Sequence, residues 1–153
     1  RLVDRIGVRW GYALAVIVWS AAAMAHAAAR GVSGFIVARF ALGLGEAGNF
    51  PAAVKATAEW FPKKERALAT GIFNAGSNVG AIVTPASVPF IVEWYGWQAA
   101  FLITGALGFV WLAFWLALYR KPDESPRVSP AELEIIQSDP IEPQTEVRWA
   151  SLL

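Results

Sequence analysis

The chain alternates between long apolar stretches and short charged clusters. Four apolar stretches, at about residues 11–29, 34–58, 67–92 and 99–119, are close to or above the length that crosses a bilayer as a helix. The connections between them are short, which favours antiparallel neighbours. Strands of a membrane barrel are shorter and alternate strictly between apolar and polar residues. The pattern therefore predicts an all-α membrane protein with four transmembrane helices.

Lysine and arginine gather on one side of these predicted helices. The other side carries Arg30 and little else. Basic residues are enriched in cytoplasmic loops, so the rich side is expected to be cytoplasmic. The chain is then a multi-pass protein of the inner (cytoplasmic) membrane, with the lipid bilayer as its surroundings. The basic side carries three clusters: Arg1, Arg5 and Arg9; Lys63, Lys64 and Arg66; and Arg120, Lys121 and Arg127.

The composition changes after Tyr119. Residues 120–148 are rich in proline and acidic side chains and predict a cytoplasmic loop. Within it, Ser129 followed by Pro130 and Glu132 is typical of a helix start and predicts a short helix over residues 130–138. Residues 149–153 are expected to begin a further segment and are left unassigned. Because the chain opens at Arg1 inside a loop motif, we interpret it as an internal piece of a longer protein.

Composition and motifs argue against several functions. The formal net charge is +1, whereas a nucleic-acid partner usually requires a basic patch or stripe. The absence of cysteine excludes disulfides and thiolate metal sites. The sequence contains no metal-ligand cluster, phosphate-binding loop or nucleophile triad. We therefore expect neither a cofactor, a metal nor an enzymatic activity.

The second apolar stretch carries two ionisable residues, Arg39 and Glu46, seven positions apart. On a helix this spacing places both on one face, about 10 Å apart along the axis. Gly43 leaves space between them, and Asn49 continues the same face. Charged residues inside a membrane span usually face a cavity or a partner. Arg39 is a candidate for binding an anionic substrate group and Glu46 for taking up and releasing a proton, whereas the alternative is a structural pair that fixes helix packing.

The third apolar stretch carries Asn74, Ser77 and Asn78, which share one helix face. Their amides and hydroxyl could hydrogen-bond the hydroxyl groups of a substrate. The alternative is hydrogen bonding between helices, with the nearby glycines permitting close approach.

These residues resemble the major facilitator superfamily. The run from Leu2 to Arg9 is similar to its loop signature between the second and third helices, and Arg39 with Gly43 is similar to its fourth-helix signature. The run from Arg39 to Pro51, followed by Glu59-Trp-Phe-Pro62 and Gly71-Ile-Phe-Asn74, more specifically resembles the anion:cation symporter family. Within that family the likeness is to bacterial hexuronate and aldonate transporters.

The resemblance implies a twelve-helix fold, of which this chain supplies four helices from the N-terminal half and part of the central loop. It implies that Arg39 binds substrate, that Glu46 couples protons, and that Asn74 and Asn78 face the transport cavity. It also implies a conformational, gating role for Asp4, Arg5, Arg9 and Glu59. The rest of the same transporter chain would complete the site.

The resulting hypothesis is proton-coupled symport of a small organic anion, a sugar acid such as a hexuronate or aldonate, by alternating access. One alternative keeps the superfamily and changes the cargo or coupling: a carrier of phosphate or another organic anion, a uniporter or an exchanger. Another alternative is a membrane scaffold that transports nothing.

Overall fold

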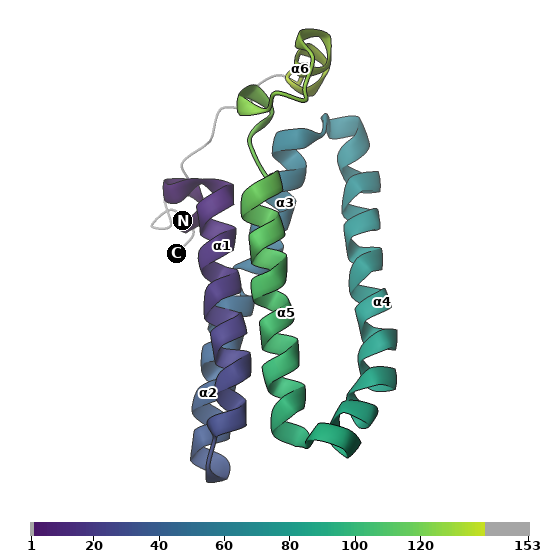
Figure 1. Ribbon diagram of the computed structural model, residues 1–153. Coiled ribbons are helices and arrows are strands. Elements are labelled where there is room, and N and C mark those ends of the chain that lie inside the picture. Colours follow the sequence, from purple (N-terminus) through teal and green to yellow (C-terminus); the bar gives the residue numbers. More distant parts are fainter. Residues whose placement is uncertain (1, 140–153) are drawn as a thin grey trace, which may run out of the picture.

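The computed structural model describes the backbone of residues 2–139 and the side chains of residues 6–139. The end of the central loop and the unassigned residues 149–153 lie outside the described residues. The regular elements of the described part are helices (Figure 1). In chain order they are α1 (Leu2–Ala25), the short 3₁₀ helix η1 (His26–Ala28), α2 (Gly31–Glu46), α3 (Asn49–Trp60), α4 (Lys63–Tyr95), α5 (Trp97–Leu118), the short 3₁₀ helix η2 (Pro122–Glu124) and α6 (Pro130–Ile136).

Within the described residues, three helices are long and apolar enough to cross a membrane: Ile6–Ala28, Lys63–Tyr95 and Trp97–Leu118. They overlap the first, third and fourth apolar stretches. Helix α4, which covers the third apolar stretch, is longer at both ends than the sequence predicts. Its charged first turn and its aromatic last turn are also helical. At the start of α1, Gly7 adopts a φ of 81°, a conformation that glycine reaches without steric cost, and this residue kinks the helix.

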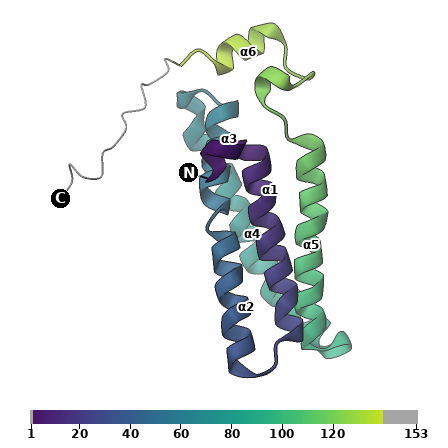
Figure 2. The ribbon, with the colours of Figure 1, turned by 90° about the vertical axis from the view of Figure 1, so that its left-hand side faces the viewer.

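The structure corrects the prediction made for the second apolar stretch. One continuous helix was expected over residues 34–58, but α2 ends at Glu46 and α3 begins at Asn49. Pro51 explains the break, because proline lacks an N–H group and its ring clashes with the carbonyl four residues earlier, that of Ala47. The chain tightens there, and the Gly48 N–H bonds the Gly45 carbonyl at 3.2 Å. The two helices follow one another through the bundle (Figure 2).

Helix α1 lies between α2 and α5 and packs closely against both through glycine. A Cβ atom built on Gly45 would lie 2.5 Å from the backbone nitrogen of Trp19. A Cβ atom on Gly105 of α5 would lie 2.8 Å from the carbonyl oxygen of Ser20. Both distances are too short for a real side chain. Small residues at crossings are a common device in membranes, where close backbone approach maximises van der Waals contact.

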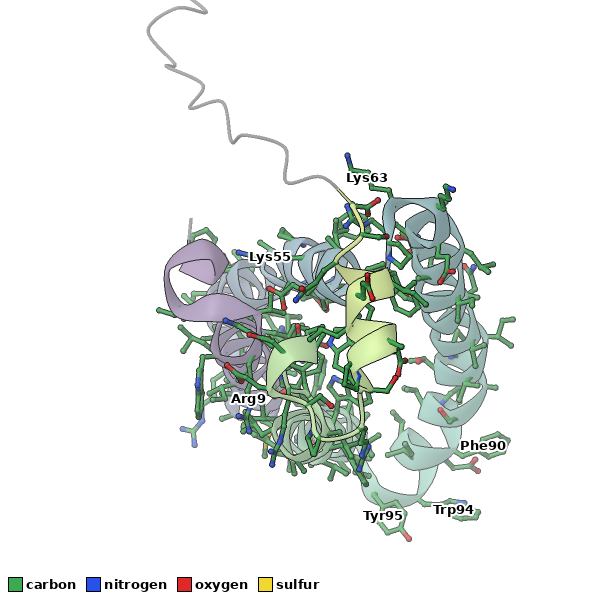
Figure 3. The ribbon with its side chains drawn as sticks, turned by 90° about the horizontal axis from the view of Figure 1, so that it is seen from above. Arg9, Lys55, Lys63, Phe90, Trp94 and Tyr95 are labelled. Carbon is green, nitrogen blue, oxygen red and sulfur yellow. The ribbon has the colours of Figure 1, made fainter. Side chains whose placement is uncertain are left out.

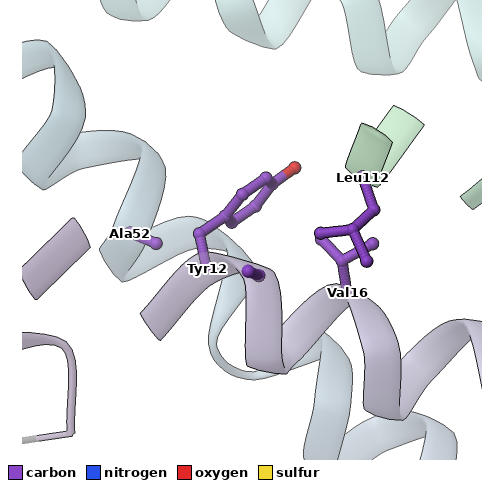
Figure 4. Close-up of a cluster of buried hydrophobic side chains, with 5 residues drawn as sticks. Tyr12, Val16, Ala52 and Leu112 are labelled. Carbon is purple, nitrogen blue, oxygen red and sulfur yellow. The ribbon is translucent and has the colours of Figure 1, made fainter. Parts of the chain in front are cut away.

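The buried core lies where α1, α3 and α5 meet (Figure 4). Tyr12 and Val16 come from α1, Ala52 from α3 and Leu112 from α5. Helix α4 stands apart from this core and has no buried residue. Seen along the bundle from the end that carries α6, α4 extends away from the other helices, with Trp94 and Tyr95 at its far end (Figure 3).

The described residues of the three basic clusters gather at one end of the bundle. The start of α1, the junction of α3 with α4 and the end of α5 all lie at the end covered by α6 (Figure 1). The α6 start follows the sequence prediction, since the Ser129 side chain accepts a hydrogen bond of 3.2 Å from the Glu132 N–H. We call this end the inner end.

Candidate functional site

Arg39 lies in a shallow hollow on the surface of α2. Its neighbours in the hollow are Ile36, Phe40, Gly43 and Leu44, and the volume is about 450 Å³. Nothing lies within 4 Å of a Cβ atom built on Gly43, so this glycine leaves the space beside Arg39 open. The hollow is otherwise apolar and offers one cationic group to a ligand.

Glu46 is the last residue of α2 and is exposed. It lies on the same helix as Arg39, so the separation along the axis follows the expected rise of about 1.5 Å per residue. Within residues 6–139, neither side chain makes a hydrogen bond or ion pair. The structure therefore does not bring them together as a structural pair. Two exposed charges on a helix that continues through a membrane bundle require water, a ligand or a further protein surface beside them.

Asn49 belongs to a different cavity. As the first residue of α3 it is partly buried, and the break after Glu46 separates it from the face of α2. The cavity, of about 550 Å³, lies between α4 and the core helices. It is lined by Tyr12, Asn49, Ala53, Ala56, Thr57, Phe73, Gly76, Ser77, Trp111 and Trp115.

The predicted polar face of α4 is divided. Ser77 reaches the cavity that contains Asn49. Asn74 and Asn78 are exposed and are not part of its lining. The described helices thus place Asn74 and Asn78 in neither the Asn49 cavity nor the Arg39 hollow.

At the inner end, Arg9 and Glu59 line the same polar cavity of about 420 Å³, together with Tyr119, Lys121 and Glu124 among others. The Arg9 guanidinium donates a hydrogen bond of 2.6 Å to the carbonyl of Leu116 on α5. The indole N–H of Trp115 donates a bond of 3.0 Å to the Arg9 carbonyl in return. Arg9 therefore ties the inner ends of α1 and α5 together, and Glu59 of α3 lines the same cavity.

Tyr119 completes this inner cluster and was not among the residues singled out from the sequence. Its hydroxyl donates a hydrogen bond of 2.7 Å to Glu59 Oε2, and its ring stacks on Trp115 at a centroid distance of 4.0 Å. Burial, reinforced by the Glu59 carboxylate, raises the pKa of the Tyr119 phenol above its usual value. The phenol therefore stays protonated and remains a donor at neutral pH. A tyrosine at a span end is commonly interfacial, so the sequence held no specific signal for this role.

Two further predicted gating residues are Asp4 and Arg5. Their backbone belongs to the first turns of α1, before the Gly7 kink, and their side chains lie outside the described residues.

The apolar helices have bilayer length, the inner end is charged, and an arginine and a glutamate are exposed on one helix. These features define a polytopic membrane protein with an ionisable site. The chain belongs to the Major Facilitator Superfamily, whose family description matches residues 1–153. The predicted superfamily and the all-helical membrane fold are therefore confirmed.

Several relatives carry names that describe transport. The galacturonate transporter of Dickeya chrysanthemi is 42% identical over 137 residues, which cover 90% of this chain and 40% of that protein. The hexuronate transporter of Escherichia coli K12 is 40% identical, covering 88% of this chain and 31% of that protein. A D-galactonate transporter of Escherichia coli O6:H1 is 35% identical, with the same coverage of each chain. The chain thus spans between 31% and 40% of the length of these relatives. Family and names point to transport and not to catalysis, as expected.

Proposed function

We propose that the intact protein is a secondary active transporter that moves a sugar acid, a hexuronate or an aldonate, across the cytoplasmic membrane together with protons. The observation that carries the proposal is the placement of Arg39 and Glu46. Both are exposed on α2, both lack a partner among the described residues, and the hollow beside Arg39 is held open by Gly43. The relatives' substrates, galacturonate, hexuronates and D-galactonate, support the choice of cargo.

The chemistry of the two residues suits different tasks. The planar guanidinium of Arg39 can hold a carboxylate through two parallel hydrogen bonds, and it is the only charged group among the described residues that line the hollow. Glu46 carries a carboxyl group, the kind of side chain that can take up and release a proton during transport. Alternating access would expose this face of α2 to each side of the membrane in turn. Asn49, Asn74 and Asn78 would contact the hydroxyl groups of the sugar acid.

The test is uptake by the purified full-length transporter in proteoliposomes under an imposed pH gradient. The substrates are galacturonate, glucuronate, D-galactonate and phosphate, the last representing the alternative cargo. We expect one or more sugar acids to accumulate and phosphate not to. Arg39→Ala should raise the KM at least about tenfold, since a charge-assisted hydrogen bond is lost. Arg39→Lys should keep part of the affinity.

The matched control is Arg30→Ala, which removes an exposed arginine just before the same helix at the opposite end of the bundle. It should transport normally. Wild-type KM values in Arg39→Ala would exclude Arg39 from the binding site. Uptake of phosphate in preference to every sugar acid would replace the proposed cargo.

A further inference from the structure

The central loop folds back onto the junction between α3 and α4. The carboxylate of Asp139 accepts a hydrogen bond of 2.5 Å from the backbone N–H of Lys63, the first residue of α4, although the two residues are 76 positions apart. The same oxygen lies 3.5 Å from the guanidinium of Arg66. The segment from η2 through α6 to Asp139, residues 122–139, thus lies across the inner end (Figures 1 and 3).

The junction needs these contacts because of its own sequence. Pro62 occupies the N-cap position of α4 and has no side-chain oxygen to accept from the first N–H groups. Lys63, Lys64 and Arg66 place positive charge at the positive end of the helix dipole, and Glu65 is the only acidic residue in the first turn. A carboxylate from another segment corrects both defects, since it accepts a hydrogen bond and supplies negative charge.

Arg66 links this carboxylate to the end of the preceding helix. Its side chain donates hydrogen bonds of 3.1 Å to the Ala58 carbonyl and 2.9 Å to the Phe61 carbonyl. These carbonyls belong to the end of α3, where backbone acceptors lack helical partners. Asp139 and Arg66 together therefore satisfy the start of α4 and the end of α3.

Residues 122–139 also cover Glu59. A cavity of about 270 Å³ is lined by Glu59 of α3 and by Lys121, Pro122, Asp123, Ile136 and Gln137. The segment therefore lies over the hydrogen bond from Tyr119 to Glu59. Helix α6 has only 7 residues, too few to be stable as an isolated helix, so its position depends on tertiary contacts.

We propose that residues 122–139 form a cytoplasmic strap, fastened by Asp139 to Lys63 and Arg66, that keeps the central loop bound to the N-terminal half and orders the α3–α4 junction over Glu59. The strap moves with this half during transport and does not hang free between the two halves. This inference does not depend on the identity of the substrate.

The test uses the full-length transporter with any other cysteines replaced and with a single cysteine introduced by Ile136→Cys. The rate at which a thiol reagent labels this cysteine from the cytoplasmic side is measured. Asp139→Asn and Asp139→Ala should each raise the labelling rate about threefold to tenfold, since a charge at a helix terminus is lost. Arg66→Gln should raise it as well, and the double variant Asp139→Asn with Arg66→Gln should add little to either alone. High salt should raise the rate in the wild type and have less effect in the variants.

The control is Glu134→Gln, which removes one negative charge from α6 in the same segment, where Glu134 is exposed and makes no hydrogen bond or ion pair among residues 6–139. It should leave labelling unchanged. Equal labelling rates in the wild type, Asp139→Ala and Glu134→Gln would show that the strap is not fastened and would overturn the proposal. Immunoblotting of membrane fractions checks that each variant is inserted at the wild-type level.

Discussion

The hydroxyl of Tyr119 donates a 2.7 Å hydrogen bond to the carboxylate of Glu59, joining the inner end of α5 to that of α3 across 60 positions of sequence. The same ring stacks on Trp115, whose indole N–H is bonded to the Arg9 carbonyl on α1. Three helices therefore meet through one aromatic cluster at the inner end. Because α3 follows α2, the helix that carries Glu46, after the break at Ala47 and Gly48, this cluster fixes the inner end of the segment proposed to bind substrate.

Removing only the Tyr119 hydroxyl should loosen that connection. Tyr119→Phe keeps the ring stacked on Trp115 and removes the hydrogen bond to Glu59. It should lower the free energy of unfolding by about 1 kcal/mol, a modest amount because the Tyr119 and Glu59 side chains are both partly exposed to water. Thermal unfolding of the purified transporter measures the change. Tyr95→Phe, at the exposed far end of α4, is the control and should have no effect.

The pH dependence of this difference follows from the raised pKa of Tyr119. A phenol whose pKa is higher in the folded state contributes its stabilisation fully below its unfolded pKa of 10.0 and loses it as the pH rises through the folded value. The stability difference between wild type and Tyr119→Phe should therefore stay constant from about pH 6 to pH 9. A difference that disappears as the pH rises within this range would contradict the account.

Two glycines on α2 should respond oppositely to the same change. Gly45→Ala places a methyl group against the backbone of Trp19 and should cost about 1–3 kcal/mol, because the two helices must move apart. Gly43→Ala meets nothing within 4 Å and should be neutral or slightly stabilising, since alanine is the better helix former. Folded yield and thermal unfolding in detergent distinguish them. Equal losses in both variants would mean that the α1–α2 crossing is not as close as described.

Gly43→Ala should nevertheless alter transport. The added methyl group narrows the hollow beside Arg39, so the KM for the sugar acid should rise while protein stability stays unchanged. Uptake assays at matched protein levels measure this. An unchanged KM would place the substrate away from this face of α2.

The proposed role of Asn74 and Asn78 can be tested by combining a variant that lacks the amide with a substrate analogue that lacks one hydroxyl group. If they bind the sugar, Asn74→Ala and Asn78→Ala should each raise the KM about fivefold, the value of one net hydrogen bond. The increase should disappear for a deoxy analogue that lacks the hydroxyl concerned. Ser87→Ala on the same helix is the control, because that hydroxyl bonds the Val83 carbonyl within α4. An equal increase for parent sugar acid and every deoxy analogue would indicate an indirect effect.

The apolar stretches allowed the helical class, the approximate helix limits and the start of α6 to be predicted, because bilayer length and capping chemistry are local properties of a sequence. The break at Ala47 and Gly48 was missed, although Pro51 signals it, because hydrophobicity runs on without interruption through the break. The same break explains why Asn49 does not lie on the helix face that carries Arg39. Such a local feature could have been recognised.

Other contacts could not have been read from the sequence. Glu59 meets Tyr119, and Asp139 meets Lys63, only because the helices fold back on one another. The glycines that permit close helix approach are also determined by packing. Gly45 and Gly105 lie at crossings, whereas Gly71, Gly76 and Gly80 of α4, where close approach was considered, have nothing within 4 Å in the described structure.

The central claim is that Glu46 carries the coupled proton, and comparing two modes of transport in one variant tests it most directly. In proteoliposomes of the full-length transporter, Glu46→Gln should keep substrate counterflow, which needs binding and alternation but no net proton movement. It should lose uphill accumulation driven by a pH gradient. Uphill accumulation at the wild-type level in Glu46→Gln, with its accompanying proton uptake, would contradict the account.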